Sequence, residues 1–306
     1  MASHDSGTAD PLSLHGVVPP TVTAFHDDES VDYETTAEHA RFVVDRGAHG
    51  VFPLGTNGEF PLLTGEERRG VVEAVVKEID DVPVIAGVGA PSTHETISHA
   101  EHAESVGVDG VVVVTPYYYP LDHEAALTHY RRVAESVSVP IYIYHIPSKT
   151  GNELGLETLA DLAAIDAVAG VKDSSKDVPW LAQAIDAHPE LTFLAGSDSL
   201  LFTGLSIGCS GLVSAVANVF PELVVDCYDA FEAGEEDRAR TLQSHVFDVR
   251  DAFKAGGAYM SGVKTALDLR GFDAGPLRDP LRRKDAESAG ELREQLESLE
   301  SIDLSP

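Results

Sequence analysis

Short, continuously apolar runs rich in β-branched residues recur along this chain, and stretches with a helical period separate them. These runs occupy residues 16–23, 50–54, 83–88, 110–115, 140–145, 168–172, 191–195 and 211–214. Strands that are apolar on both faces are typical of parallel sheets covered by helices. Eight alternating strand and helix units therefore predict an α/β fold, the closed (β/α)8 TIM barrel.

An open doubly wound sheet is the alternative, but no G-x-G-x-x-G motif follows the first predicted strand. The length of 306 residues suits a barrel of about 250 residues with extensions. After about residue 217 the pattern is helical, and helices are expected near 221–233, 235–254, 258–269 and 286–299. We expect a flexible tail (1–13), the barrel (14–220), and the last barrel helix with a C-terminal helical segment (221–306).

The charge balance excludes several kinds of partner. Asp and Glu number 51 against 21 Lys and Arg, which gives a formal net charge of −30. Such a chain repels nucleic acid and anionic membranes, so we expect neither as a partner. An acidic surface poor in lysine also suggests a halophilic protein, because concentrated salt screens the self-repulsion.

The remaining composition favours a cytoplasmic protein. Cys209 and Cys227 are too few for a disulfide framework. No apolar run reaches the roughly 18 residues that a transmembrane helix needs. The first residues are polar and include Asp5, unlike a signal peptide.

In a (β/α)8 barrel, reactive residues stand at the C-terminal ends of the strands. The run 168–172 ends in Lys172, which Asp173 follows. A lysine at the mouth of a barrel is partly desolvated, and desolvation keeps part of the amine neutral and nucleophilic, as a Schiff base requires. The alternative is a lysine that caps the strand and pairs with Asp173.

Two more strand ends carry candidate residues. Tyr144 is the last tyrosine of the run 140–145 and lies at the rim, where a phenol can relay protons to a carbonyl oxygen, although an aromatic residue can also simply fill the barrel top. The sequence G-T-N-G-E at 55–59 can hold a carboxylate on backbone N–H groups and the Thr56 hydroxyl, or be an ordinary turn. Three tyrosines at 117–119 favour a subunit contact.

The order of these motifs along the chain is specific. The G-T-x-G-E loop, the tyrosines, Y-x-x-P at 144–147 and G-V-K-D at 170–173 resemble the dihydrodipicolinate synthase and N-acetylneuraminate lyase family. The resemblance covers roughly residues 14–282. It implies a class I aldolase on a (β/α)8 barrel that acts on a 2-keto acid through a Schiff base, without a cofactor. No H-E-x-x-H motif or carboxylate cluster predicts a metal site.

The resemblance also assigns roles to residues. Lys172 would form the imine with the carbonyl of pyruvate, and Tyr144 would relay protons. Thr56 would link Tyr144 to Tyr118, which in several members reaches in from a neighbouring subunit. Substrate contacts would come from Gly55, Thr56, Asn57, Lys149 and the backbone carbonyl of Val213. A homo-oligomer, a dimer or tetramer, is what the family suggests.

Departures from the family pattern bear on the substrate. Lysine-biosynthesis members commonly have G-T-T-G-E, Tyr-Asn and a later arginine, where this chain has Asn57, His145 and Lys149. The Y-Y-Y-P segment at 117–120 is more similar to that of the 2-keto-3-deoxygluconate aldolases. Members that act on phosphorylated sugars tend to have an arginine after that proline, where this chain has Leu121. A phosphate would then need Lys149, His145 or the backbone near Asp198.

The predicted reaction is therefore cleavage of 2-keto-3-deoxygluconate, or its 6-phosphate, to pyruvate and glyceraldehyde or its 3-phosphate. Dihydrodipicolinate synthase (condensation of pyruvate with aspartate semialdehyde) is the alternative. Sialic acid lyase, 4-hydroxy-2-oxoglutarate aldolase and the sugar-acid dehydratases remain further possibilities. Readings from other classes are a keto-acid sensor, which would lack Lys172 or Tyr144, and a nicotinamide-dependent reductase.

Overall fold

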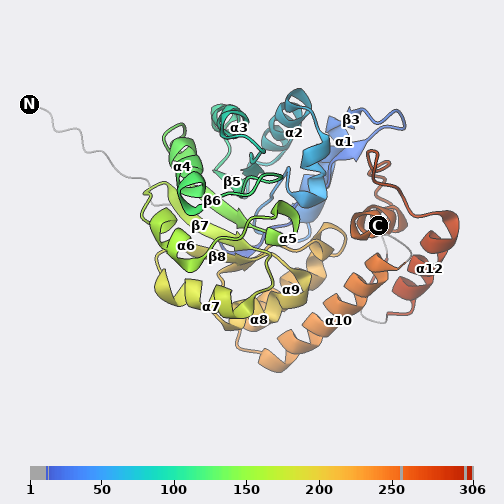
Figure 1. Ribbon diagram of the computed structural model, residues 1–306. Helices are drawn as coiled ribbons and strands as arrows, with labels where there is room; N and C mark the ends of the chain where they lie inside the picture. Colours follow the sequence, from blue (N-terminus) through green and yellow to red (C-terminus); the bar gives the residue numbers. More distant parts are fainter. Residues whose placement is uncertain (1–11, 13, 256–257, 300–301, 305–306) are drawn as a thin grey trace, which may run out of the picture.

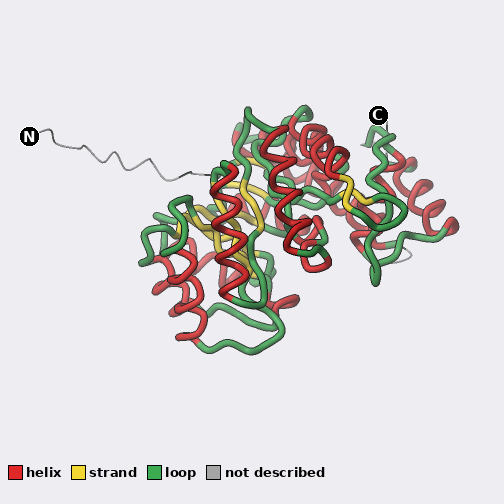
Figure 2. Tube along the Cα trace, turned by 90° about the horizontal axis from the view of Figure 1, so that it is seen from above, coloured by secondary structure: helices red, strands yellow, loops and turns green. Residues whose placement is uncertain are grey.

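The structure is a computed structural model that describes residues 12, 14–255, 258–299 and 302–304. Strands lie at the centre of the molecule and helices surround them (Figures 1 and 2). Most of the tail predicted over residues 1–13 lies outside the described residues.

Seven strands form one sheet in which every neighbouring pair is parallel. In sheet order they are β1 (Gly16–Val17), β9 (Gly211–Leu212), β8 (Thr192–Ala195), β7 (Val168–Asp173), β6 (Ile141–His145), β5 (Gly110–Val114) and β4 (Ile85–Gly87).

The segment 49–53 closes this sheet into a barrel. On one side Val51 bridges Val84 in parallel, and Ile85 N–H donates to the Val51 carbonyl at 3.0 Å. On the other side the N–H groups of 49 and 52 donate to the carbonyls of 17 and 19, at 2.8 and 3.0 Å. All eight predicted runs thus lie in the wall, and the predicted (β/α)8 barrel is confirmed.

Prolines shorten the first two strands. The sequence predicts one strand over 16–23, but β1 ends at Val17. Beyond it the wall continues through the hydrogen bond from Val18 N–H to Leu212 and the hydrogen bonds of Pro19 and Thr21 with Phe52. Pro19, Pro20 and Pro53 have no N–H to donate to a ladder. A two-stranded antiparallel hairpin, β2 (Ala24–Phe25) and β3 (Val31–Asp32), follows.

A helix follows each wall strand. The eight are α1 (Tyr33–Val44), α2 (Gly65–Glu78), α3 (Thr93–Val106), α4 (His123–Ala134), α6 (Leu156–Ala163), α7 (Val178–Ala187), α8 (Leu201–Ser206) and α9 (Pro221–Glu232). Side-chain oxygens of Asp32, Thr64, Ser92, Asp122 and Asp177 accept backbone N–H groups at the starts of α1, α2, α3, α4 and α7. Such N-caps are why these helices begin where they do.

The C-terminal segment packs beside α9, on one side of the barrel (Figure 1). It contains α10 (Glu236–Lys254), α11 (Tyr259–Leu269) and α12 (Ala286–Glu297), close to the ranges predicted from the sequence. Leu292 and Leu296 of α12 are fully buried and attach that helix to the main core. Within the described ranges, no helix is both long and apolar enough to cross a bilayer.

Candidate active site

Lys172 stands near the C-terminal end of β7, and its side chain is buried among aromatic rings. Its Nζ lies 3.5 Å from the centroid of the Tyr144 ring and 5.0 Å from that of Phe52. In the segment that follows β8, a Cβ added at Gly196 would lie 3.0 Å from Lys172 Cε. The glycine therefore leaves room for the lysine side chain. The predicted nucleophile thus lies in an enclosed, largely apolar space.

Burial lowers the pKa of Lys172 below its ordinary value. Tyr144 and Asp173 act in the opposite direction, but desolvation outweighs them. A lowered pKa leaves more of the amine neutral, which is the form that attacks a carbonyl.

Tyr144 is the neighbour of Lys172 across the β6–β7 ladder. Its hydroxyl is 3.1 Å from Thr56 Oγ1. Burial acts to raise the pKa of Tyr144, but Lys172 beside it and the hydrogen bond with Thr56 outweigh burial, so the pKa is lowered. A phenol with a lowered pKa next to an amine is suited to moving protons at that place.

The loop that carries Thr56 is held closely against the barrel rim. It forms a short 3₁₀ turn over Thr56–Gly58, and the Thr23 hydroxyl donates to the Gly58 carbonyl at 2.7 Å. Asn57 is buried, and within the described residues nothing accepts a hydrogen bond from its Nδ2. The structure thus brings Thr56 to Tyr144, and leaves the Asn57 amide with a donor to offer.

A cavity of about 380 Å³ extends from Thr56 to Lys149. Lys149 is exposed on the short helix α5 (Pro147–Thr150), and no other described residue of the lining is cationic. Apolar side chains form much of the wall, among them Phe60, Val114, Tyr117, Ile146, Met260 and Leu281. The C-terminal segment supplies part of this wall, and the sequence did not predict that contribution.

Two other predicted residues have different positions. Tyr118 is 84% exposed and has a left-handed backbone with φ 82°, so the structure does not bring it to Thr56 within one chain. Val213 is buried directly after β9, and its N–H donates to the Ala195 carbonyl at 2.8 Å. The site within one chain therefore contains Lys172, Tyr144 and Thr56, while Tyr118 faces outward.

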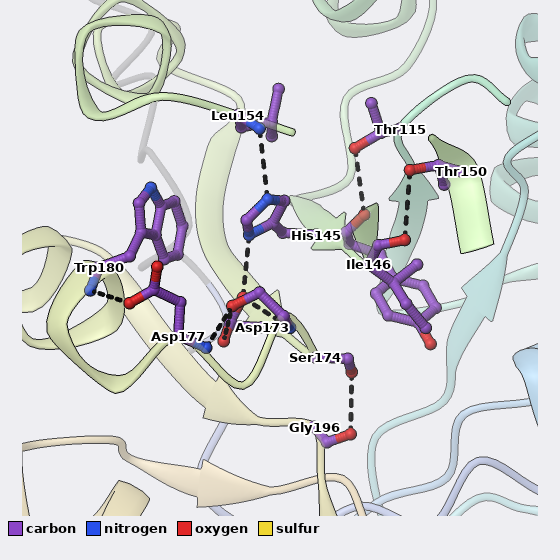
Figure 3. Close-up of polar contacts among 12 residues, drawn as sticks. Thr115, His145, Ile146, Thr150, Leu154, Asp173, Ser174, Asp177, Trp180 and Gly196 are labelled. Atoms are coloured by element: carbon purple, nitrogen blue, oxygen red, sulfur yellow. Dashed lines mark hydrogen bonds and ion pairs between the residues drawn. The ribbon is translucent and has the colours of Figure 1, made fainter. Parts of the chain in front are cut away.

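A buried His145–Asp173 pair (Figure 3) occupies the next register position after the two candidate catalytic residues on β6 and β7. His145 Nδ1 is 2.9 Å from Asp173 Oδ1, and each side chain is 1% exposed. Asp173 therefore pairs with His145, and the sequence-based alternative of a Lys172–Asp173 ion pair is not what the structure has. Successive strand residues face opposite sides, which turns Asp173 away from Lys172.

A second buried pair, Glu59 and Lys264, lies behind the Thr56 loop. Lys264 Nζ is 2.9 Å from Glu59 Oε1, and both side chains are fully buried. Glu59 also accepts the Arg278 backbone N–H at 3.0 Å, and Lys264 donates to the Pro276 carbonyl at 2.8 Å. The only signal for Lys264 in the sequence is that a charged residue stands within an apolar helical pattern.

Asp198 forms a third network that sequence reasoning did not detect. Its carboxylate accepts the Ser214 hydroxyl at 2.5 Å and the Tyr259 hydroxyl at 2.6 Å. Tyr259 lines the cavity, so this network joins the segments that follow β8 and β9 to α11. A buried carboxylate here makes a phosphate site near Asp198 electrostatically unfavourable.

Comparison with known proteins shows which family this chain is similar to. The model of the dihydrodipicolinate synthetase family matches residues 13–299. An uncharacterized DapA-like lyase of Halobacterium salinarum is 70% identical over 294 residues, covering 96% of each chain. A 4-hydroxy-tetrahydrodipicolinate synthase of Methanopyrus kandleri is 37% identical, over 94% of this chain and 97% of the relative. The solved structure of KD(P)GA from T. tenax is 29% identical, with a TM-score of 0.85 over 92% of this chain and 97% of that one.

Proposed function

This chain belongs to the dihydrodipicolinate synthetase family, a family of lyases, and we propose that it is a class I aldolase that cleaves 2-keto-3-deoxygluconate or its 6-phosphate. The products are pyruvate and glyceraldehyde or its 3-phosphate. The observation that carries the proposal is the buried Lys172 amine beside Tyr144, whose hydroxyl meets Thr56 in the lining of a cavity that Lys149 also lines.

The reaction begins at Lys172. Its neutral amine attacks C2 of the keto acid, and loss of water gives an imine that is cationic once protonated. The Thr56 loop holds the substrate carboxylate, together with Asn57 Nδ2, which has no acceptor among the described residues. By the family resemblance, the backbone carbonyl of Val213 would lie near the reacting centre.

The bond between C3 and C4 then breaks. Tyr144 takes the proton of the C4 hydroxyl, C4 leaves as the aldehyde carbonyl, and the bonding electron pair moves through C3 to the cationic imine nitrogen. Protonation of the resulting enamine at C3 and addition of water at C2 release pyruvate and restore Lys172. Condensation follows the same steps in reverse.

Two observations favour a sugar acid as substrate. The cavity has room for several carbons beyond C4, since pockets of roughly 300 Å³ or more hold small metabolites. Lys149 in its lining is a point charge that suits a terminal phosphate. The likeness to KD(P)GA from T. tenax supports the same substrate class.

Dihydrodipicolinate synthase activity is the second candidate. The 37% identity to a Methanopyrus kandleri 4-hydroxy-tetrahydrodipicolinate synthase favours it, and Lys149 suits the carboxylate of aspartate semialdehyde as well as a phosphate. Both candidates share the pyruvate imine on Lys172 and differ only in the aldehyde at the Lys149 end.

The decisive experiment is borohydride reduction with pyruvate, followed by peptide mapping. A pyruvate adduct on Lys172 is expected in the wild type, and none in Lys172→Ala. Cleavage of each sugar acid is then followed by pyruvate release, and aspartate semialdehyde is offered with pyruvate in parallel. No adduct in folded protein at high salt contradicts the mechanism. An adduct with turnover of aspartate semialdehyde alone overturns the sugar-acid substrate.

A further inference from the structure

One loop supplies part of the cavity wall, including its lysine. It runs from the end of β6 to Leu154, and Ile146, Lys149 and Thr150 of this loop line the cavity. Its helical part, α5, has only four residues, so contacts outside the loop must hold it in place.

His145 joins the two ends of this loop. Its Nε2 accepts the backbone N–H of Leu154 at 3.2 Å, and both residues are buried (Figure 3). A backbone N–H can only donate, so Nε2 is the acceptor and the ring proton is on Nδ1. Nδ1 donates that proton to Asp173 Oδ1, at 2.9 Å.

The imidazole is itself held from two sides. Asp173 accepts the Ser175 N–H at 3.2 Å and the Ser175 hydroxyl at 3.0 Å, which leaves its carboxylate in one orientation. The Trp180 ring packs against His145 with centroids 4.5 Å apart. Hydrogen bonds and ring packing therefore hold each contact in the series from β7 through Asp173 and His145 to Leu154.

The same loop also holds the tyrosine segment. Asn152 donates from Nδ2 to the carbonyls of Pro116 and Tyr119, at 2.8 and 2.9 Å, and accepts the Leu121 N–H at 2.8 Å. Tyr117 of that segment forms another part of the cavity wall. Displacement of the loop would move Lys149 and Tyr117 together.

We propose that His145, oriented by Asp173, is a positioning residue for the distal end of the substrate. It acts through Lys149 and the loop between β6 and Leu154, and it takes no part in imine formation. The inference rests on the proposed aldolase in that it assumes an aldehyde half that reaches Lys149. It assigns a role in specificity to a buried pair that touches no substrate.

The test compares His145→Leu with His145→Gln, which keeps a donor and an acceptor. For His145→Leu we expect a KM for the cleaved keto acid raised by roughly tenfold or more, with the rate of pyruvate imine trapping unchanged. His145→Gln should recover part of the KM. Combined with Lys149→Met, His145→Leu should add little further, because both act on one contact. His129→Leu, at another buried histidine that bonds Thr93 on the outer helices, is the matched control.

Hydrogen exchange at the Leu154 amide gives a readout independent of substrate. Loss of protection there with an unchanged KM would overturn the positioning role. If imine trapping slows by the same factor by which KM rises, His145 belongs to the catalytic core instead. If the wild type turns over only aspartate semialdehyde, the proposed function fails, and the same comparison made with that aldehyde still decides the role of His145.

Discussion

Lys172 and Tyr144 face one another across the β6–β7 ladder, with the Lys172 Nζ 3.5 Å from the centroid of the Tyr144 ring. The register of two neighbouring strands thus places an amine of lowered pKa beside a phenol of lowered pKa. Each group influences the other, and Thr56 holds the phenol hydroxyl at 3.1 Å.

Replacing Tyr144 by Phe should slow turnover by about 10²- to 10⁴-fold, because a positioned acid–base group is lost. Steady-state rates of pyruvate release measure the change. Thr56→Val, which removes only the partner of the hydroxyl, should slow turnover less. An unchanged rate in Tyr144→Phe would move the proton relay to another residue.

Tyr118 should act in the site of a neighbouring subunit, because its side chain is 84% exposed and lies outside the site of its own chain. We expect Tyr118→Phe to lower activity. Mixing it with Lys172→Ala under conditions that exchange subunits should restore part of that activity. Tyr119→Phe, at a neighbour that is 71% exposed, is the control. Absence of complementation in verified mixed oligomers would argue against a shared site.

Lys264→Met should destabilise the fold by about 3–5 kcal/mol, because it leaves the fully buried Glu59 carboxylate without its partner. Urea unfolding at constant salt measures this change in the free energy of unfolding. Lys254→Met, which removes an exposed ion pair with Asp251, should cost about 0–1 kcal/mol. Similar costs for the two variants would contradict the importance of the buried pair.

Mild acid should destabilise the protein through His39. Burial lowers its pKa from 6.5 to about 4 in the folded state. The unfolded chain therefore binds a proton first, so this contribution to stability is complete above pH 6.5 and is lost as the pH falls through about 4. Urea unfolding across that range should show a shallower pH dependence for His39→Gln. Above pH 6.5 the free energy of unfolding should depend on pH in the same way in the wild type and the variant. An identical slope of that free energy below pH 6.5 would refute the assignment to His39.

The net charge of −30 should make stability depend on salt. Counter-ions screen repulsion among surface carboxylates, so the midpoint of thermal unfolding should rise as potassium chloride is raised from dilute to molar concentration. Sucrose at matched osmolality controls for effects unrelated to charge. Full stability in dilute buffer would exclude a requirement for salt.

Local patterns in the sequence predicted the barrel and its catalytic strand ends. The eight apolar runs predicted the wall, because strands covered on both faces must be apolar throughout. Lys172 and Tyr144 were found because each is a reactive residue at the end of such a run. The first strand came out shorter than expected, since Pro19 and Pro20 cannot donate to a ladder.

Tertiary structure decided which distant groups meet. His145 pairs with Asp173 because of the register between β6 and β7, and Glu59 meets Lys264 because α11 packs against the Thr56 loop. Met260 of α11 and Leu281 after it also line the cavity, although nothing near them in sequence marks a site. Periodicity depends on neighbours a few residues apart and so determines elements and their buried faces. Pairings between segments depend on how those elements pack, and only the folded chain specifies that.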